Sequence, residues 1–317
     1  MIVVLTGGTG GAKFVDGVRQ VVPEEDLTII VNTADDLEWW GLYVSPDVDS
    51  ITYVLSGLLS EERGWGVKGE TFFCQQTMKK LGQPVWFNMG DRDLGLHLCR
   101  TKLLHEGKTL TEATAEISSQ LGIRAKILPM SNSHIETRVD TPIGELSFQE
   151  YFVQRWYQDP VNAVYFAGIE QASPGPAVID CIMSATTILL APSNPITSIA
   201  PILSVPGVRA ALRNTHATIA AVSPIIGNAA VSGPAGILMA AKGLPVSIAG
   251  VATCYRDFLD VLVVDDADRE AAEELQQSGL RVECTTTVMK RIADRINLAR
   301  VTLAAAGASS LPASGGI

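Results

Sequence analysis

A cluster of glycines near the start of the chain is the stretch best suited to chemistry. Thr6-Gly7-Gly8-Thr9-Gly10-Gly11 follows an apolar run and precedes apolar residues at helical spacing. This pattern predicts a strand, a tight turn and a helix. Glycines let the backbone approach a ligand closely, and the free N–H groups at a helix start favour an anion. We therefore predict that this loop, together with Lys13, binds a phosphate or a diphosphate.

The glycine cluster matches neither of two common nucleotide-binding motifs. A P-loop needs Gly-Lys-Ser/Thr, whereas Lys13 lies between Ala12 and Phe14. The dinucleotide motif needs a third glycine where this chain has Lys13. The alternative is a tight turn without a ligand, but four glycines in the five residues from Gly7 to Gly11 are costly for a turn alone. Phosphate binding is therefore the favoured interpretation.

Polar side chains also follow other predicted strands. They are Asn32 and Asp35 after residues 27–31, Arg92 after residues 85–88, and Ser193 and Asn194 after residues 186–190. Open α/β sheets bind ligands at the carboxyl ends of their strands, so these side chains are expected to extend the site. The alternatives are a turn with a helix cap for Asp35 and a surface ion-pair turn for Arg92. We predict that Arg92 serves as a guanidinium fork for phosphate.

Two acidic residues, Asp47 and Asp49, lie two positions apart in Ser45-Pro46-Asp47-Val48-Asp49-Ser50. In extended backbone both carboxylates would face one side, and such a pair suits a hard cation such as Mg²⁺. The alternative is that Asp49 or Ser50 caps the helix that the following residues predict, and both can hold at once.

Composition limits the classes of partner. The net charge of −10 argues against a nucleic-acid surface, and an anionic substrate would need compensation from a few cations or N–H groups. Five scattered cysteines suit a reducing cytoplasm rather than a disulfide framework or a zinc site. No apolar stretch is long enough to predict a membrane span or a signal peptide. A cytoplasmic protein acting on small molecules is expected.

Predicted strands and helices alternate along the whole chain. This alternation predicts one α/β domain over residues 1–305, built on a doubly wound, mostly parallel, Rossmann-like sheet. A hairpin pattern around Asp140–Gly144 interrupts it and predicts an inserted covering subdomain over residues 129–160. Residues 306–317, rich in Ser, Gly and Ala, are expected to form a frayed tail.

The candidate residues form no Ser-His-Asp or Cys-His set, which leaves phosphoryl-group chemistry or nucleotide binding. Taken in order, five motifs resemble the 2-phospho-L-lactate transferase family of deazaflavin coenzyme (F420) biosynthesis. They are Thr6–Lys13, Asn32-Thr33-Ala34-Asp35-Asp36, Ser45–Ser50, Gly90-Asp91-Arg92-Asp93-Leu94 and Ala191-Pro192-Ser193-Asn194-Pro195. The resemblance covers nearly the whole chain, and the motifs are specific as a set.

The resemblance implies a magnesium-dependent enzyme. It would move the 2-phospho-L-lactate moiety from lactyl-2-diphospho-5′-guanosine to the ribityl hydroxyl of the deazaflavin Fo, giving F420-0 and GMP. Carried over by position, the glycine loop and Asn32 would hold donor phosphates, with residues 192–195 on the donor side. Asp49 and Arg92 would contact the deazaflavin as catalytic residues, and Asp47 or Asp49 would bind Mg²⁺.

A non-catalytic, nucleotide-sugar-binding regulatory branch of the same superfamily is the main alternative. There the Asp-Asp pair is typically followed by Gly-Gly-Ser-Ser, whereas Leu37-Glu38-Trp39-Trp40 follows here, which favours the transferase. An NAD-dependent oxidoreductase is disfavoured by the incomplete glycine motif. The choice between a lactyl and an enolpyruvyl donor stays open. A homodimer is expected because homodimers are common among soluble enzymes.

Overall fold

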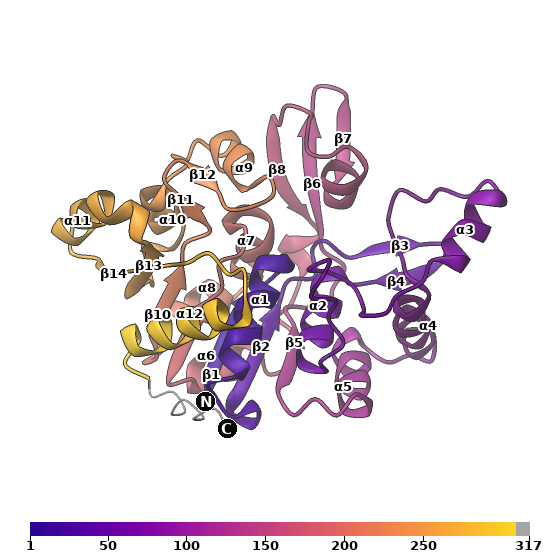
Figure 1. The fold of residues 1–317 in the computed structure, drawn as a ribbon, viewed down its shortest axis with the longest axis horizontal. Coiled ribbons are helices and arrows are strands. Elements are labelled where there is room, and N and C mark those ends of the chain that lie inside the picture. The colour runs from indigo at the N-terminus through magenta and orange to yellow at the C-terminus, as the bar shows by residue number, and fades with distance from the viewer. Residues whose placement is uncertain (309–317) are drawn as a thin grey trace.

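The apolar runs of the sequence form a seven-stranded parallel sheet in the computed structural model, which describes residues 1–308 (Figure 1). The strand order is β14-β13-β10-β9-β1-β2-β5, so the winding reverses between β1 and β9. This confirms the predicted doubly wound, Rossmann-like sheet. The strands are β1 (Ile2–Thr6), β2 (Leu27–Val31), β5 (Lys126–Pro129), β9 (Thr187–Leu190), β10 (Thr218–Val222), β13 (Val261–Asp265) and β14 (Arg281–Thr285).

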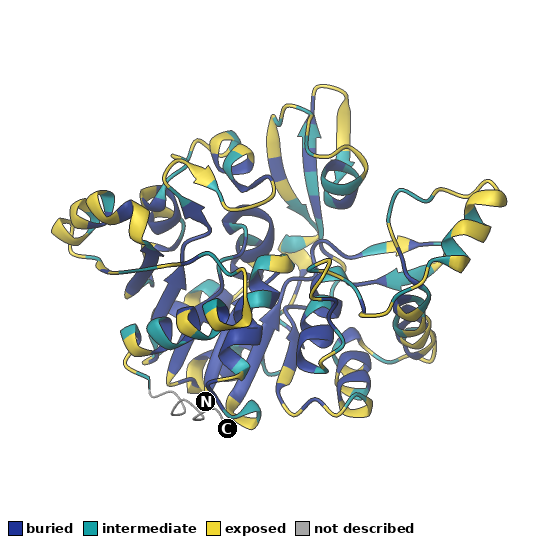
Figure 2. Ribbon diagram, in the orientation of Figure 1, coloured by how far each residue is buried: buried dark blue, intermediate teal, exposed yellow. Residues whose placement is uncertain are grey.

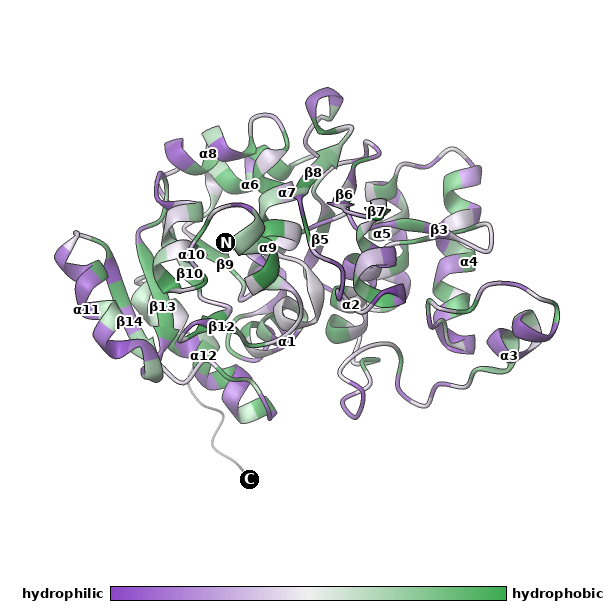
Figure 3. Cartoon of the chain, turned by 90° about the horizontal axis from the view of Figure 1, so that it is seen from above, coloured by the Kyte–Doolittle hydropathy of each residue, from purple (hydrophilic) through white to green (hydrophobic). Residues whose placement is uncertain are grey.

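Helices cover both faces of this sheet because neighbouring side chains of a buried strand point to opposite sides. Ile2 and Val4 of β1 enter one apolar core, and Val3 and Leu5 enter the other. The first core is covered by α1 (Gly8–Arg19), α2 (Pro46–Leu55) and α12 (Ile292–Ala305). The second is covered by α6 (Val178–Ser184), α7 (Ala200–Ser204), α8 (Val208–Asn214), α9 (Ala235–Ala241), α10 (Ile248–Tyr255) and α11 (Arg269–Gln277). Figure 2 shows the buried strands between partly exposed helices, and Figure 3 shows the hydrophilic residues of α11 at one end of the molecule.

A separate antiparallel sheet, in the order β7-β6-β8, stands beyond the carboxyl ends of the central strands (Figure 1). It contains the predicted hairpin at Asp140–Gly144. Its elements are β6 (Glu136–Thr141), β7 (Gly144–Ser147), the π-helix η2 (Glu150–Gln154) and β8 (Ala163–Ala167). The division into a domain over 1–305 and a subdomain over 129–160 stays a prediction. Residues 309–317 of the predicted tail lie outside the described part.

Apart from α2, the segment between β2 and β5 projects beyond the edge strand β5, at the right of Figure 1. The prediction of a strand at residues 85–88 is wrong, because the backbone there is irregular and pairs with no strand of the described chain. Its aromatic rings pack instead on the hairpin formed by β3 (Leu37–Trp39) and β4 (Leu42–Val44). The Trp86 ring lies 4.7 Å from that of Trp39. The other elements here are α3 (Phe73–Lys80), α4 (Asp91–His105) and α5 (Leu110–Gln120).

Short elements complete the chain. They are the hairpin of β11 (Ile225–Ile226) and β12 (Ala229–Ala230), the π-helix η4 (Pro195–Ile199), and the 3₁₀ turns η1 (Glu24–Asp26), η3 (Ile169–Gln171) and η5 (Asp266–Asp268). Within residues 1–308, no single helix is long and apolar enough to cross a bilayer. One bent pair, 195–204 with 208–214, meets that test by length and composition, and its apolar residues belong to the second core.

Candidate active site

Gly7 connects β1 to α1, and Gly8, Gly10 and Gly11 lie in the first turn of α1, where the winding of the sheet reverses; we call Thr6–Gly11 the glycine loop. Gly8 has φ +68°, a left-handed conformation that favours glycine. Gly7 is extended, but a Cβ there would lie 2.5 Å from Asp47 Oδ2 and 2.9 Å from Ser198 Cβ. Two neighbouring segments therefore approach the loop closely, which only the absence of side chains permits. Thr9 is exposed on the first turn of α1.

The start of α1 already holds one carboxylate of the protein. The Gly8 N–H donates to Asp47 Oδ1 at 2.7 Å. Asp47 lies in the first turn of α2, where Pro46 opens the helix. Free N–H groups at a helix start attract negative charge, so the contact fits the predicted anion preference of this loop. Phosphate binding itself stays a prediction.

Asn32 links Asp35 and the first turn of α2 to the segment that follows β9. Its Nδ2 group lies 3.0 Å from Asp35 Oδ2, 3.0 Å from Asp47 Oδ2 and 3.2 Å from the Thr197 carbonyl oxygen. Asn32 is completely buried. Burial is the largest effect on both acids: it raises the pKa of Asp47 to about 6 and, with the charge of Asp47, raises the pKa of Asp35 well above its usual value. The structure thus brings Asn32, Asp35 and Asp47 together.

Ser193 and Asn194, which follow β9, make different contacts. Ser193 Oγ donates to the Gly7 carbonyl at 2.7 Å and so ties this loop to the glycine loop. Asn194 Oδ1 accepts from the Ile196 N–H and caps the π-helix η4. That helix places the Thr197 carbonyl against Asn32. The sequence predicted both residues at the site, but it did not predict this division of roles.

Several buried polar atoms around these strand ends lack a hydrogen-bond partner in the described chain. They are Thr6 Oγ1, Thr33 Oγ1, Asp35 Oδ1 and Thr197 Oγ1. Buried polar groups are nearly always paired, so unpaired ones gathered in one place indicate a contact with water, an ion or a ligand. Their positions at the ends of β1, β2 and β9 coincide with the predicted binding edge.

The expectation that Asp47 and Asp49 face the same side is wrong. Both lie on α2, and residues two apart on a helix point in nearly opposite directions. Asp47 points to the glycine loop, whereas both carboxylate oxygens of Asp49 accept from Arg100 on α4. Pro46 was the available signal, because proline is favoured in the first turn of a helix.

Sequence reasoning missed Arg100 and His97. They share one face of α4 with Asp93, at spacings of three and four residues, and that spacing was the signal that could have revealed them. His97 Nδ1 lies 3.5 Å from Asp49 Oδ2, and its Nε2 lies 3.3 Å from Asp93 Oδ1. The Tyr53 hydroxyl also contacts Asp93. These side chains form a buried polar cluster between α2 and α4.

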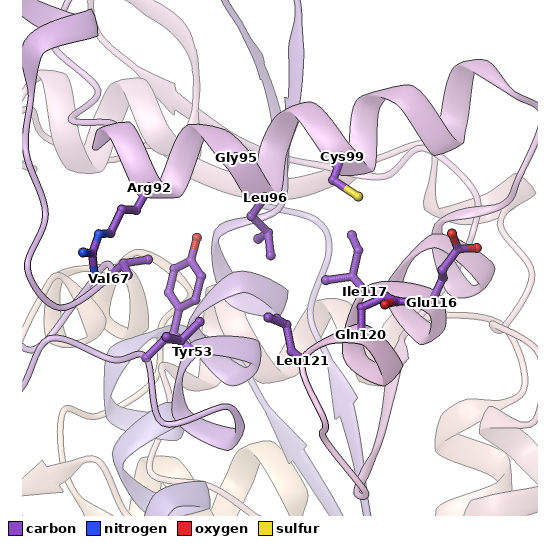
Figure 4. A pocket seen from close by; sticks show the side chains of 11 residues that line it. Tyr53, Val67, Arg92, Gly95, Leu96, Cys99, Glu116, Ile117, Gln120 and Leu121 are labelled. Atoms are coloured by element: carbon purple, nitrogen blue, oxygen red, sulfur yellow. The ribbon is translucent and has the colours of Figure 1, made fainter.

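Neither Arg92 nor Lys13 takes part in the hydrogen bonds of Asn32 and Asp47 described above. Arg92 is exposed on the first turn of α4, and its Nη1 donates to the Lys68 carbonyl at 3.0 Å. It borders an apolar groove of about 390 Å³ between α2, α4 and α5, beside the ring of Tyr53 (Figure 4). Lys13 lies near Gly64, since a Cβ added to Gly64 would be 3.9 Å from Lys13 Nζ. The roles assigned to these two cations stay predictions.

Comparison with known proteins finds relatives along nearly the whole chain. A family described as 2-phospho-L-lactate transferase CofD matches residues 2–299. A 2-phospho-L-lactate transferase from Methanococcoides burtonii is 45% identical over 92% of this chain and 94% of its own length. The corresponding enzyme from Methanosarcina mazei is 40% identical over 96% and 100%. A phosphoenolpyruvate transferase from Streptomyces griseus subsp. griseus is 39% identical over 95% and 97%.

The fold has a solved counterpart. A crystal structure of a UPF0052 family member from Bacillus halodurans matches with a TM-score of 0.65 and 18% identity, covering 95% of this chain and 98% of that one. At that identity the likeness concerns the fold alone. The match of the family over residues 2–299, together with relatives at 40–45% identity along nearly their whole length, shows that this chain belongs to the 2-phospho-L-lactate transferase (CofD) family and is a transferase of F420 biosynthesis.

Proposed function

We propose that the protein transfers the 2-phospho-L-lactate moiety from lactyl-2-diphospho-5′-guanosine to the ribityl hydroxyl of the deazaflavin Fo, giving F420-0 and GMP. The observation that carries the proposal is the convergence at the start of α1. There the glycine loop, Asn32, Ser193 and the carboxylate of Asp47 meet where the sheet reverses its winding. Such switch points bind nucleotides in open α/β sheets.

The residues at this edge fit a magnesium ion. Mg²⁺ usually takes one or two carboxylates together with phosphate oxygens and water. Asp35 and Asp47 supply two carboxylates that meet at one amide group, and Asp35 Oδ1 has no other partner in the described chain. We therefore propose Asp35 and Asp47 as the magnesium ligands, in place of Asp47 with Asp49. When bound, Mg²⁺ would neutralise part of the charge on the diphosphate.

The chain's own groups position the reaction. In the proposed step the acceptor oxygen bonds to the phosphorus that carries the lactyl group, the bond from that phosphorus to the bridging oxygen breaks, and GMP leaves with the electron pair. The acceptor hydroxyl loses its proton to solvent water. A loose transition state of this kind needs positioning and charge stabilisation more than a strong base. The N–H groups that follow Gly8 at the start of α1 would supply fixed dipoles for that purpose, while the Asn32 amide holds Asp35 and Asp47 in place.

The acceptor is proposed to approach from the side of α4. The resemblance assigns Arg92 to the deazaflavin, and Arg92 borders an apolar groove beside Tyr53 (Figure 4). The lactyl donor is proposed because the relatives at 40–45% identity bear that name, while the Streptomyces relative at 39% is named for phosphoenolpyruvate. We also propose a cytoplasmic homodimer.

The experiment offers each donor in turn. Purified protein, Fo and Mg²⁺ are incubated with the lactyl or the enolpyruvyl guanosine diphosphate compound, and products are identified by chromatography and mass spectrometry. GMP release with formation of F420-0 from the lactyl donor is expected, and chelation of Mg²⁺ should stop it. Faster turnover of the enolpyruvyl donor would reject the proposed donor, and no GMP from either compound would reject the proposed activity.

A further inference from the structure

The first turn of α2 has two polar faces with different surroundings. On one face, Asp47 reaches the Gly8 N–H and the Asn32 amide. On the other, Asp49 is bound by both terminal nitrogens of the Arg100 guanidinium, and these two residues are only 3% and 1% exposed. The carboxylate at the glycine loop and the carboxylate in the ion pair are therefore carried by the same helical turn.

The connection that leads into α2 is held at the same place. Ser45, the residue before the helix, donates from Oγ to Asp36 at 2.7 Å, and Tyr43 donates from its hydroxyl to the same carboxylate at 2.8 Å. Arg100 Nη1 also lies 3.5 Å from the Tyr43 carbonyl. Arg100 thus contacts both the incoming strand and the first turn of α2.

Stability alone is a poor reason for such a cluster. Moving charges out of water offsets most of the attraction between them, and apolar replacements for a buried pair are often neutral or stabilising. The rest of α2 packs through apolar side chains such as Val48 and Ile51, so the helix has ample apolar contact without the pair. What an ion pair with two hydrogen bonds adds is a fixed position and orientation.

We propose that Arg100 is a positioning residue that acts through Asp49, fixing the first turn of α2 and so holding Asp47 at the glycine loop. The inference rests on the proposed function, in which Asp47 faces the donor phosphates and Mg²⁺. In this proposal Asp49 serves as the anchor of this turn. His97, which lies between Asp49 and Asp93, supports the pair from the same face of α4.

A double-mutant cycle tests the coupling. Asp49→Asn, Arg100→Gln and the double variant are prepared, and binding of GDP with Mg²⁺ is measured by calorimetry on the folded protein. Each single variant is expected to bind GDP about tenfold more weakly, and the double variant no more weakly than the poorer single one, because neighbours in one network are not additive. Independent, multiplying losses would overturn the proposal.

A matched control separates positioning from general destabilisation. Arg295→Gln breaks a comparably buried ion pair with Asp16, at 2.8 Å between α12 and α1, and a second pair with the exposed Glu61, and neither partner lies in α2. It is expected to lower the melting temperature like Arg100→Gln while GDP affinity stays within about twofold. Equal losses of GDP affinity in both variants would show a merely structural role for Arg100.

Two further measurements distinguish a failure of this inference from a failure of the proposed function. In steady-state kinetics, Arg100→Lys should raise the KM for the donor and leave the KM for Fo unchanged; a change confined to the KM for Fo would instead place Asp49 on the acceptor. A crystal structure of Arg100→Gln is informative even if no transfer is found. Asp47 is expected to have left the Gly8 N–H, and a retained contact would overturn the positioning role whatever the activity.

Discussion

Replacing Gly7 with alanine is the sharpest perturbation of the glycine loop. Gly7 has φ −163°, an extended conformation that alanine adopts freely, so backbone strain contributes nothing. The added Cβ would instead lie 2.5 Å from Asp47 Oδ2 and 2.9 Å from Ser198 Cβ. Both neighbours must shift, and the Asp47 carboxylate, which makes the closer contact, can do so by rotating. We therefore expect Gly7→Ala to displace Asp47 from the Gly8 N–H.

The magnitude follows from the contacts that are lost. A hydrogen bond to a charged group contributes about 1.5–3 kcal/mol, and overpacking a filled site costs about 1–3 kcal/mol. If the lost contact serves the transition state, kcat/KM should fall about 10- to 150-fold, because each 1.36 kcal/mol is a factor of ten. If both contributions are lost, the free energy of unfolding should fall by about 2.5–6 kcal/mol.

The assay is GMP release at varied Mg²⁺, with urea unfolding in parallel. Thr253→Ala is the control: Thr253 is an exposed residue of α10, outside the glycine loop and the groove beside Arg92, so activity should persist and stability should change by less than about 1 kcal/mol. Gly7→Ala with unchanged turnover and unchanged magnesium dependence would refute the reasoning that glycine is needed to admit Asp47.

Three further outcomes are expected. Because burial raises the pKa of Asp47 from 3.8 to about 6, the folded state binds that proton more tightly, and the free energy of unfolding should decline as pH rises through this interval. In Asp47→Asn, the free energy of unfolding measured with urea should decline less steeply with pH across this interval. An unchanged dependence on pH would contradict the raised pKa of Asp47. Arg92→Met should raise the KM for Fo several-fold with the donor KM unchanged, and the opposite pattern in steady-state kinetics would move Arg92 to the donor. Thr109→Ala should lower the free energy of unfolding by about 1 kcal/mol without changing turnover, since Thr109 and Glu112 form a complete capping box on α5; calorimetry checks the stability.

The central sheet was predictable because most of its strands are apolar runs followed by turn residues. The same reasoning failed at residues 85–88, whose aromatic side chains pack on Trp39 without any strand partner. Periodicity reports burial, and it does not say which partner provides the burial. The predicted strand there is therefore the clearest error of local reasoning.

The candidate site was predictable in part. The glycine loop, Asn32, Asp35 and Ser193 meet as expected because carboxyl ends of parallel strands share one edge. The direction of Asp49 depended on where α2 begins, and its partner Arg100 lies 51 residues away, beyond the reach of any local pattern. Contacts of that kind follow from the packing of α4 on the hairpin and on α2.

The links across the glycine loop have a consequence for how the chain acquires this site during synthesis. Gly7 contacts Ser193 across 186 positions, and Asn32 contacts Thr197 across 165. Translation produces the loop first and its partners much later, so a nascent chain that ends before Ser193 has neither the Ser193 tether nor the Thr197 carbonyl. Pairings of such long range carry a large loop-closure entropy and form slowly. The ability to hold a nucleotide should accordingly arise only after about two thirds of the polypeptide has left the ribosome.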